Sequence, residues 1–532
     1  MLSYKLCKVF NDKKRDDMKK LLYTFLGASM LFSMSCSKDY LDTIPEDSGS
    51  ASVIFETADN AKLAVNGLCK MMGAQYLHSQ GFNGEGTIKT YYGNFPGNDF
   101  QKSNKTSMAS LCNMLYVERN TIKYDYYPWF YYYKLIGNAN AIVANIDKAS
   151  GDEKTKQEVK AQALTFRAYS YFMLSQIYCK RWVDSENGAS RGLPLRLDQS
   201  TGDLAPSSLG QIYEQIYKDL DEAIVNFQNS GWERDDDDNY TPDIHVAYAT
   251  YARAALTRQD WANAAKYASL ARSSFSLMSN DEYVDGGFNT PNKEWIWSVY
   301  SSEDQTLFYY SFFAYQASNS NASQCKRYPC AISKELLDQI PDTDVRKQMF
   351  LVPQNGESFS TKSGEAKSAL ETRAKKTFGE KLNSSSKIFA YMQFKFQNTA
   401  NPGIGHLNNF RAAEMYLTEA EANCHLGKEQ AAQKLMVELN GKRNPGYTCN
   451  KTGNELLEEV KLYRRFELWG EGFDWFDYKR WNQPISRKTY SEGGSFHSAF
   501  AVTIKPEDAN RWTWIYPAKE IDYNDDIDSA FE

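Results

Sequence analysis

The sequence predicts a mainly α-helical protein. We expect four helical hairpins of the tetratricopeptide type in a superhelical scaffold, with long irregular insertions and a loop-rich C-terminal lobe. Three observations support this prediction. Several stretches carry apolar residues at three- and four-residue spacing, two of these stretches are rich in alanine, and the segments between them show no helical period. The 532 residues are 42% hydrophobic and 24% charged, a composition typical of globular proteins.

A lipoprotein signal peptide is predicted over residues 1–35, with Met18 as a possible true start. A short basic start precedes a mostly apolar run at 21–32, and small serines stand at the third and first positions before Cys36. A membrane-spanning anchor is the alternative, but the uncharged stretch is at the lower length limit for a span. We therefore predict that Cys36 carries lipid.

After Cys36 the chain is expected to form a tether and then one domain. The tether, 36–50, is polar and contains a proline and acidic residues. The domain, 51–532, is expected to comprise a helical scaffold at about 51–274 and 408–445, an insertion at 275–407, and a C-terminal lobe at 446–532. The functional residues are expected in the insertions, because helical scaffolds with long irregular segments usually carry their binding residues there.

The scaffold helices follow from hydrophobic spacing. A helix at 129–147 is expected to begin just after Pro128. Alanines such as Ala252 and Ala268 recur on facing sides of the pair 246–256 and 261–273, which allows close helix approach. The expected helices are 55–72, 129–147, 153–178, one capped by Ser207 or Ser208, 246–256, 261–273, 412–426, 430–440 and 455–469.

The cysteines favour free thiols. Beyond Cys36 the chain holds seven cysteines, an odd number, with no CxxC and no histidine at zinc spacing. Buried free thiols are the preferred interpretation, and a bridge between Cys325 and Cys330 is the alternative. We predict no metal site. The acidic run 235–239 fails the calcium-loop pattern, because tyrosine and valine stand where that loop needs glycine and glutamate.

Several function classes are excluded by composition and motif. The net charge is −6 and no long basic run occurs in the body of the chain, so no nucleic-acid partner is expected. No nucleotide-binding loop, nucleophile elbow or zinc-protease motif is present. We therefore predict no cofactor and no catalytic residue.

Four local sequences resemble those of the SusD/RagB family of Bacteroidetes outer-membrane proteins. They are RAYSYFML at 167–174 followed by GLPL at 192–195, RAAEMYLTEA at 411–420, RRFELWGEGFDWFDYKRW at 464–481, and IYPAKEI at 515–521. The resemblance covers nearly the whole mature chain. It implies a surface-exposed, lipid-anchored glycan-binding protein of the outer membrane, acting with a SusC-like TonB-dependent transporter.

The segment 91–100 is the first candidate ligand surface. Sugars have apolar C–H faces and hydroxyl rims, so a binder needs aromatic rings beside polar groups. The segment supplies both, and the resemblance to the SusD/RagB family favours it as a glycan-binding surface. The candidate residues are Tyr91, Tyr92, Asn94, Phe95, Asn98 and Asp99. The alternative is that these rings pack the loop onto the helices.

The segment 308–315 is the second candidate, with Tyr309 and Tyr310 as ligand residues. Before it, the run 295–300 alternates as a strand with one buried face would. The later run is too aromatic to lie wholly on the surface, so part of it is expected in the core. The tyrosine cluster at 124–133 is expected to be core.

Three function classes remain open. A glycan-binding lipoprotein is preferred. A helical glycoside hydrolase would need a carboxylate pair at defined separation, and no pair stands out. A peptide-binding or scaffolding lipoprotein is the third class. The block 464–481 is interpreted as a staple between the C-terminal lobe and the helices rather than as a ligand site.

Overall fold

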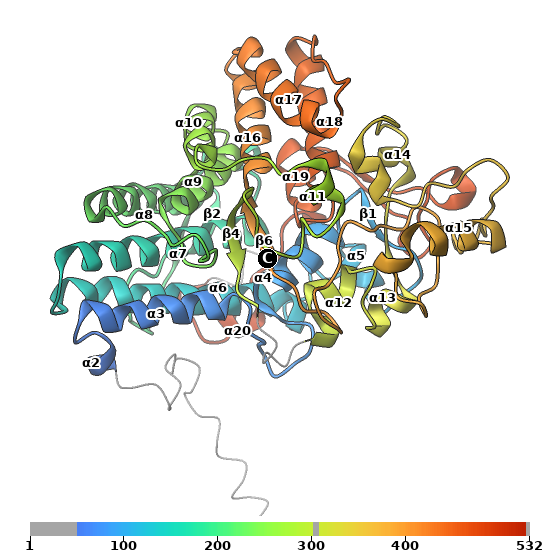
Figure 1. Cartoon of the computed structure of the whole chain (residues 1–532). Coiled ribbons are helices and arrows are strands. Elements are labelled where there is room, and N and C mark those ends of the chain that lie inside the picture. The colour runs from blue at the N-terminus through green and yellow to red at the C-terminus, as the bar shows by residue number, and fades with distance from the viewer. Residues whose placement is uncertain (1–50, 302–307, 528–532) are drawn as a thin grey trace, which may run out of the picture. The chain divides into compact units, whose positions relative to one another are not determined.

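Long helices form the scaffold of the fold and pack side by side (Figure 1). The computed structural model describes residues 51–301 and 308–527, so the predicted signal peptide, Cys36 and the tether lie outside the described residues. The long helices are α3 (Ala58–Met71), α6 (Lys123–Asn145), α7 (Glu153–Tyr178), α8 (Leu209–Ser230), α9 (Ile244–Arg258), α10 (Trp261–Arg272), α16 (Ala412–His425), α17 (Glu429–Arg443) and α18 (Gly453–Glu467). The shorter α19 (Asp474–Trp481) follows α18. The mainly helical prediction is confirmed.

The helices pack in an order that brings distant parts of the chain together. Helix α7 packs along both α6 and α8, and α9 packs on α10. Helix α10 then packs on α16, which also contacts α17 and α18. The chain therefore leaves the helical array after α10 and returns to it with α16, as the predicted insertion at 275–407 requires. Figure 1 shows α16–α18 in orange beside the green α9 and α10.

Local capping sets the helix ends. The Ser208 hydroxyl accepts a hydrogen bond from the Gln211 amide (3.2 Å), and the Gln211 side chain accepts one from the Ser208 amide (2.9 Å). This capping box starts α8 at the predicted serine. The helix stops at Gly231, whose positive φ of 61° is a conformation that glycine adopts at low cost. On α9 and α10, the facing alanines Ala252 and Ala268 are fully buried, as predicted.

Helix α6 begins at Lys123, so the prediction that it starts after Pro128 is wrong. Proline has no N–H, which leaves the Tyr124 carbonyl without its usual helical donor. The Tyr92 hydroxyl donates to that carbonyl instead. The Tyr178 hydroxyl donates to the Asp125 carbonyl and accepts from the amide of Trp129, at 3.2 Å. Two tyrosines from other segments therefore let the helix run through a proline.

Short helices and turns make up the insertions. The short α-helices are α2 (Ala51–Ile54), α4 (Gly84–Thr87), α5 (Ala109–Cys112), α11 (Asn280–Val284), α12 (Phe312–Gln316), α13 (Ser323–Arg327), α14 (Lys334–Leu337), α15 (Ser368–Phe378) and α20 (Ala518–Ile521). One π-helical stretch, η1 (Ile88–Asn94), follows α4 directly. The 3₁₀ turns are η2 (Ile146–Lys148), η3 (Trp182–Asp184), η4 (Phe308–Tyr310), η5 (Val345–Met349), η6 (Gly379–Lys381), η7 (Tyr490–Glu492) and η8 (Ala509–Arg511).

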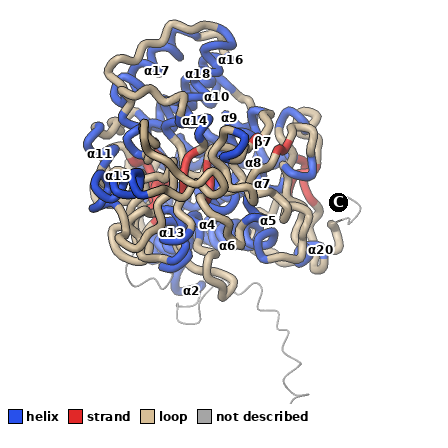
Figure 2. Tube along the Cα trace, turned by 90° about the vertical axis from the view of Figure 1, so that its right-hand side faces the viewer, coloured by secondary structure: helices blue, strands red, loops and turns tan. Residues whose placement is uncertain are grey.

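The strands form two-stranded antiparallel ribbons, shown as short red segments in Figure 2. The ribbons are β1 (Phe100–Lys102) with β5 (Cys330–Ile332), β2 (Arg191–Pro194) with β3 (Pro206–Ser208), β4 (Trp295–Val299) with β6 (Leu407–Arg411), and β7 (Ile485–Ser486) with β8 (Thr503–Ile504). The predicted strand at 295–300 is confirmed as β4. All five of its residues are buried, so the expected exposed face is wrong.

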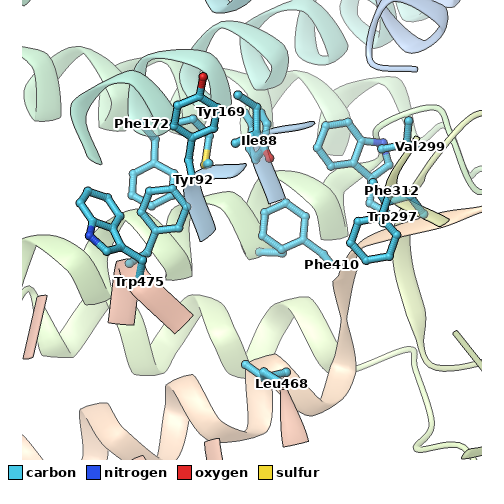
Figure 3. Packing of buried hydrophobic residues seen from close by; sticks show 14 of the residues in the cluster. Ile88, Tyr92, Tyr169, Phe172, Trp297, Val299, Phe312, Phe410, Leu468 and Trp475 are labelled. Carbon is cyan, nitrogen blue, oxygen red and sulfur yellow. The ribbon is translucent and has the colours of Figure 1, made fainter. Parts of the chain in front are cut away.

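The ribbon β4–β6 is buried because helices and aromatic rings cover it. The rings of Trp297 on β4 and Phe410 on β6 stack at 5.9 Å, and Tyr169 of α7 packs edge-on against Trp297 at 5.3 Å. Figure 3 shows these rings in the same core as Ile88 and Phe312. Two-stranded ribbons are marginal alone, so this packing stabilises them.

The seven cysteines from Cys69 to Cys449 are free, and all but Cys424 are buried. The free-thiol interpretation is confirmed, and Cys325 and Cys330 are not bridged. Within 51–301 and 308–527, no helix is both long enough and apolar enough for a membrane crossing.

Candidate functional site

The aromatic residues of 91–100 lie in the core. Tyr91, Tyr92 and Phe95 are 2%, 1% and 1% exposed. The Tyr91 hydroxyl lies 2.7 Å from that of Tyr315, and the Tyr91 ring stacks on Phe95 at 5.7 Å. A buried ring offers no face to a sugar, so these three rings are not accessible to a ligand in this structure. The alternative interpretation, loop packing, describes them.

The polar residues of the same segment are occupied by internal hydrogen bonds. Asn94 donates to the Gly470 carbonyl (2.7 Å) and accepts from the Gly472 amide (2.8 Å). The Asp99 carboxylate forms a two-bond ion pair with Arg465, at 2.7 and 2.9 Å. Asn98 is half-buried, and its side-chain oxygen accepts from the Ser486 amide at 2.7 Å. The polar atoms of Asn94 and Asp99 are therefore occupied by contacts with the C-terminal lobe.

A buried ionic network joins the scaffold to the C-terminal lobe. Arg411 contacts Glu294 (2.6 Å) and Glu467 (2.8 Å), and Arg443 contacts both carboxylates as well (3.1 and 3.2 Å). Burial acts to raise the pKa of Glu467, but Arg443, Arg411 and Arg346 outweigh it and hold the pKa below its usual range. The network confirms that the block 464–481 staples the lobe to the helices. Its charges are paired, so it has the features of a structural centre.

An open groove lies beside the second predicted segment. It runs between the end of α3, helix α4, the end of β4, helix α12 and residues 403–407. Phe312 and Phe313 line it from α12, and Tyr300 lines it beyond β4. Tyr309 and Tyr310 precede α12 in η4. Tyr309 is 60% exposed, whereas Tyr310 is partly buried with its Cβ near the 79–83 turn.

The groove is uncharged and contains aromatic and backbone groups. None of the residues that line it carries a carboxylate or a cation. Tyr300 packs edge-on against Tyr240 at 5.2 Å, and the Tyr240 hydroxyl lies 3.0 Å from Nδ1 of His406. Burial lowers the pKa of His406, which keeps the imidazole neutral at pH 7. Such a groove suits a neutral ligand with an apolar face.

The structure brings together only part of the predicted site. Tyr310 lies next to the groove, because the side chain of Asn83, which lines it, donates to the Tyr310 carbonyl (3.3 Å). Tyr309 precedes Tyr310 in η4, whereas Tyr91 and Asp99 lie in the interior. Sequence reasoning missed Tyr300 and the 403–407 wall. Tyr300 is the last residue of the predicted strand and follows the end of β4. This position was the signal that could have indicated it. The part of the chain that the structure describes contains no His, Cys, Asp and Glu cluster suited to a metal ion.

The chain matches two family models over most of its length. Residues 39–256 match the model "SusD-like_3", described as "Starch-binding associating with outer membrane", and residues 228–529 match "SusD_RagB", described as "SusD family". The SusD-like protein P38 of Formosa agariphila is 23% identical over 506 residues, which cover 88% of this chain and 92% of that protein.

Solved structures with the same fold extend this similarity. A SusD-like carbohydrate binding protein from Bacteroides vulgatus matches with a TM-score of 0.70 and 22% identity, covering 88% of this chain and 97% of that one. A SusD superfamily protein from Bacteroides thetaiotaomicron matches with a TM-score of 0.70 and 21% identity, covering 89% and 99%. At this identity the likeness establishes the fold.

Proposed function

The chain belongs to the SusD family, and from this premise we propose that it is a surface-exposed lipoprotein that captures glycan. The ligand is an oligo- or polysaccharide, which the protein delivers to a SusC-like TonB-dependent transporter in the outer membrane. The matched description, starch-binding and association with the outer membrane, supports the ligand class and the location.

SusD-family proteins are binding proteins without catalytic activity. The groove agrees with this assignment, because a glycosidase needs two carboxyl groups flanking the scissile bond. No carboxylate lines the groove. We therefore do not retain the helical glycoside hydrolase, and the peptide-binding alternative becomes an outcome of the binding experiment below.

The open groove beside Tyr309 is the observation that carries the proposal. An exposed tyrosine can stack on the apolar face of a sugar without first leaving the core. Tyr309 meets this requirement with 60% exposure. Tyr310, the next residue in η4, and Tyr300, which lines the groove, are partly exposed. We propose these three tyrosines as the ligand platform.

A glycan panel tests the proposal directly. We expect the mature chain to be retained on an affinity gel of its glycan without shortening that glycan. Tyr309→Ala should weaken binding by about 1–3 kcal/mol, by analogy with base stacking on aromatic side chains. Tyr523, an 84% exposed tyrosine next to α20, gives the matched control Tyr523→Ala, which should bind normally. Binding of peptides but no glycan would contradict the assignment.

Anchoring through Cys36 is a separate part of the proposal. Cys36 follows a signal peptide pattern, and Lys38-Asp39 after it resembles the family's surface-export signal. Cys36→Ala should release the protein from the membrane fraction or leave it uncleaved, and protease treatment of whole cells should degrade the wild type. Normal processing together with unchanged membrane fractionation would contradict lipidation.

A further inference from the structure

A second hollow lies where the helical scaffold meets the C-terminal lobe. It runs between the C-terminal turns of α7 and α9 and helix α19, as two adjoining small cavities. The two cavities share Gln176, Thr257, Phe476 and Arg480, so they form one cleft. This cleft has no lining residue in common with the aromatic groove.

Cationic side chains dominate the lining of the cleft. The inner cavity is lined by Lys89, Arg253, Arg464 and Arg480, against the carboxylates of Glu85 and Asp477. The outer cavity is lined by Lys180, Arg181, Lys479 and Arg480, and none of its lining residues is acidic. The charge of the cleft therefore differs from that of the uncharged groove.

The arginines of the cleft are paired, whereas its lysines are not. Arg480 forms two hydrogen bonds to Glu421, at 2.5 and 2.8 Å, and Arg181 pairs with Asp184 at 2.5 Å. Among the ion pairs of residues 51–301 and 308–527, none includes Lys89, Lys180 or Lys479. An unpaired cation near a cavity is a binding group for an anion.

Lys479 is the most constrained of these cations. It is 5% exposed, and its Nζ donates to the carbonyls of Gln176 (2.6 Å) and Cys179 (3.0 Å) at the end of α7. An ammonium group has three donors, so one N–H remains for a ligand. The negative end of the helix dipole compensates about half a charge. Burial lowers the pKa of Lys479 to about 7, with Arg181 also lowering it and Asp184 opposing.

A buried donor without a partner lies in the inner cavity. Asn409 is 1% exposed and lines this cavity, and its Nδ2 has no hydrogen-bond partner among the described residues. Leaving a buried donor unsatisfied costs about 1–3 kcal/mol. Both ends of the cleft therefore offer donors that a ligand rich in acceptors would satisfy.

We propose that this cleft is a second ligand site, which binds a small molecule carrying an oxyanion, either a carboxylate or a sulfate group. Lys479 and Lys180 hold the charge in the outer cavity, and Asn409 Nδ2 donates to an acceptor further in. Lys180 is exposed and stands at the entrance, so the site can be reached from solvent. The site does not depend on glycan binding in the groove.

Titration of the purified mature chain with glucuronate, inorganic sulfate and neutral glucose tests the site. We expect glucuronate or sulfate to bind, measured by calorimetry and as a rise in melting temperature, and glucose not to bind through this cleft. The anion that binds more tightly shows whether the site prefers a carboxylate or a sulfate group. Selenate soaked into crystals should give an anomalous peak next to Lys479 Nζ.

Two variants and two controls make the result decisive. Lys479→Gln should weaken anion binding by about tenfold or more, since a charge-assisted hydrogen bond is lost. Because Lys479 also supports the end of α7, Lys180→Gln at the exposed entrance gives an independent variant with a smaller, several-fold loss. Lys376→Gln, which changes an exposed lysine on α15, and Tyr309→Ala in the groove should bind the anion normally.

Absence of anion binding would overturn the proposal. Binding that is unchanged in both Lys479→Gln and Lys180→Gln would also overturn it, because the anion would then sit elsewhere. Neither result would affect the proposed glycan site, which is tested by Tyr309→Ala and neutral glycans.

Discussion

The segments 91–100 and 308–315 have similar compositions and are both largely buried, but the second presents an exposed ring at Tyr309. Both combine tyrosines and phenylalanines with small residues, and both satisfy the same chemical requirement for a sugar platform. In the structure Tyr91 is 2% exposed, whereas Tyr309 is 60% exposed. The two segments even meet, through the hydroxyls of Tyr91 and Tyr315 at 2.7 Å. Aromatic density therefore indicates that a segment packs against something, but not whether the partner is protein or ligand.

Contacts with distant segments account for the difference: the Tyr91 ring packs on Phe82, Tyr124 and Tyr315, and other residues of 91–100 contact the C-terminal lobe. The segment 91–100 is covered by residues more than 350 positions further along the chain, including Arg465 and Asp474. A Cβ on Gly93 would lie 2.1 Å from the Gly472 carbonyl oxygen, so the two backbones touch directly. Tyr309 remains 60% exposed in the described structure. Four experiments test this contrast.

The largest expected effect is on core packing. Phe95→Ala should lower the free energy of unfolding by about 3–5 kcal/mol, because it leaves a cavity among Tyr91, Phe100 and Tyr315. Chemical denaturation measures the change. The folded fraction should still bind glycan. A loss of glycan affinity with unchanged stability would make 91–100 the platform after all.

A smaller effect is expected from one buried hydroxyl. Tyr91→Phe keeps the ring but removes the hydrogen bond to Tyr315. A buried hydroxyl without its partner costs about 1–3 kcal/mol, so stability should fall by that amount. Tyr309→Phe is the matched control at an exposed position and should leave denaturation unchanged. Equal effects at both positions would contradict the contrast.

Stability should also depend on the pH through Asp125, which packs beside Tyr92. Burial raises the pKa of Asp125 to about 9, and neither carboxyl oxygen has a partner within the described structure. The folded state then binds one proton more than the unfolded state between about pH 4 and pH 9, so stability falls as the pH rises, by at most about 1.4 kcal/mol per pH unit.

Asp125→Asn removes this titration and should flatten the pH dependence measured by thermal unfolding. Asp235→Asn, in the exposed acidic turn, should leave the dependence as in the wild type. A variant Asp125→Asn with the full wild-type slope would show that this carboxyl group is not the cause.

The smallest effect on stability is expected at the exposed ring. Tyr309→Ala should change the free energy of unfolding by less than about 0.5 kcal/mol, because a mostly exposed side chain contributes little to the core. The same variant should lose glycan affinity. Melting temperature and gel retardation, measured on one preparation, check both statements. A large loss of stability would mean that Tyr309 packs like Tyr91.

The sequence alone determined the helical elements, the family motifs and the kind of ligand chemistry. Hydrophobic spacing predicted α7 at its observed bounds, Glu153–Tyr178, because helix periodicity is a local property. Alanine spacing predicted the close approach of α9 and α10 for the same reason. The charged block 464–481 was identified as a staple, since so many charges beside tryptophans must be paired when buried.

Only the tertiary structure decided which rings face solvent and where the cavities lie. Burial of Tyr91, continuation of α6 through Pro128, and the uncharged groove beside Tyr309 each depend on residues distant in the chain. The local sequence determines the periodicity of a helix or strand. The exposure of a side chain depends on which distant segments pack against it. In the segment 91–100, Asn94 forms hydrogen bonds with the turn at 470–472 of the C-terminal lobe. That turn lies more than 370 residues further along the chain.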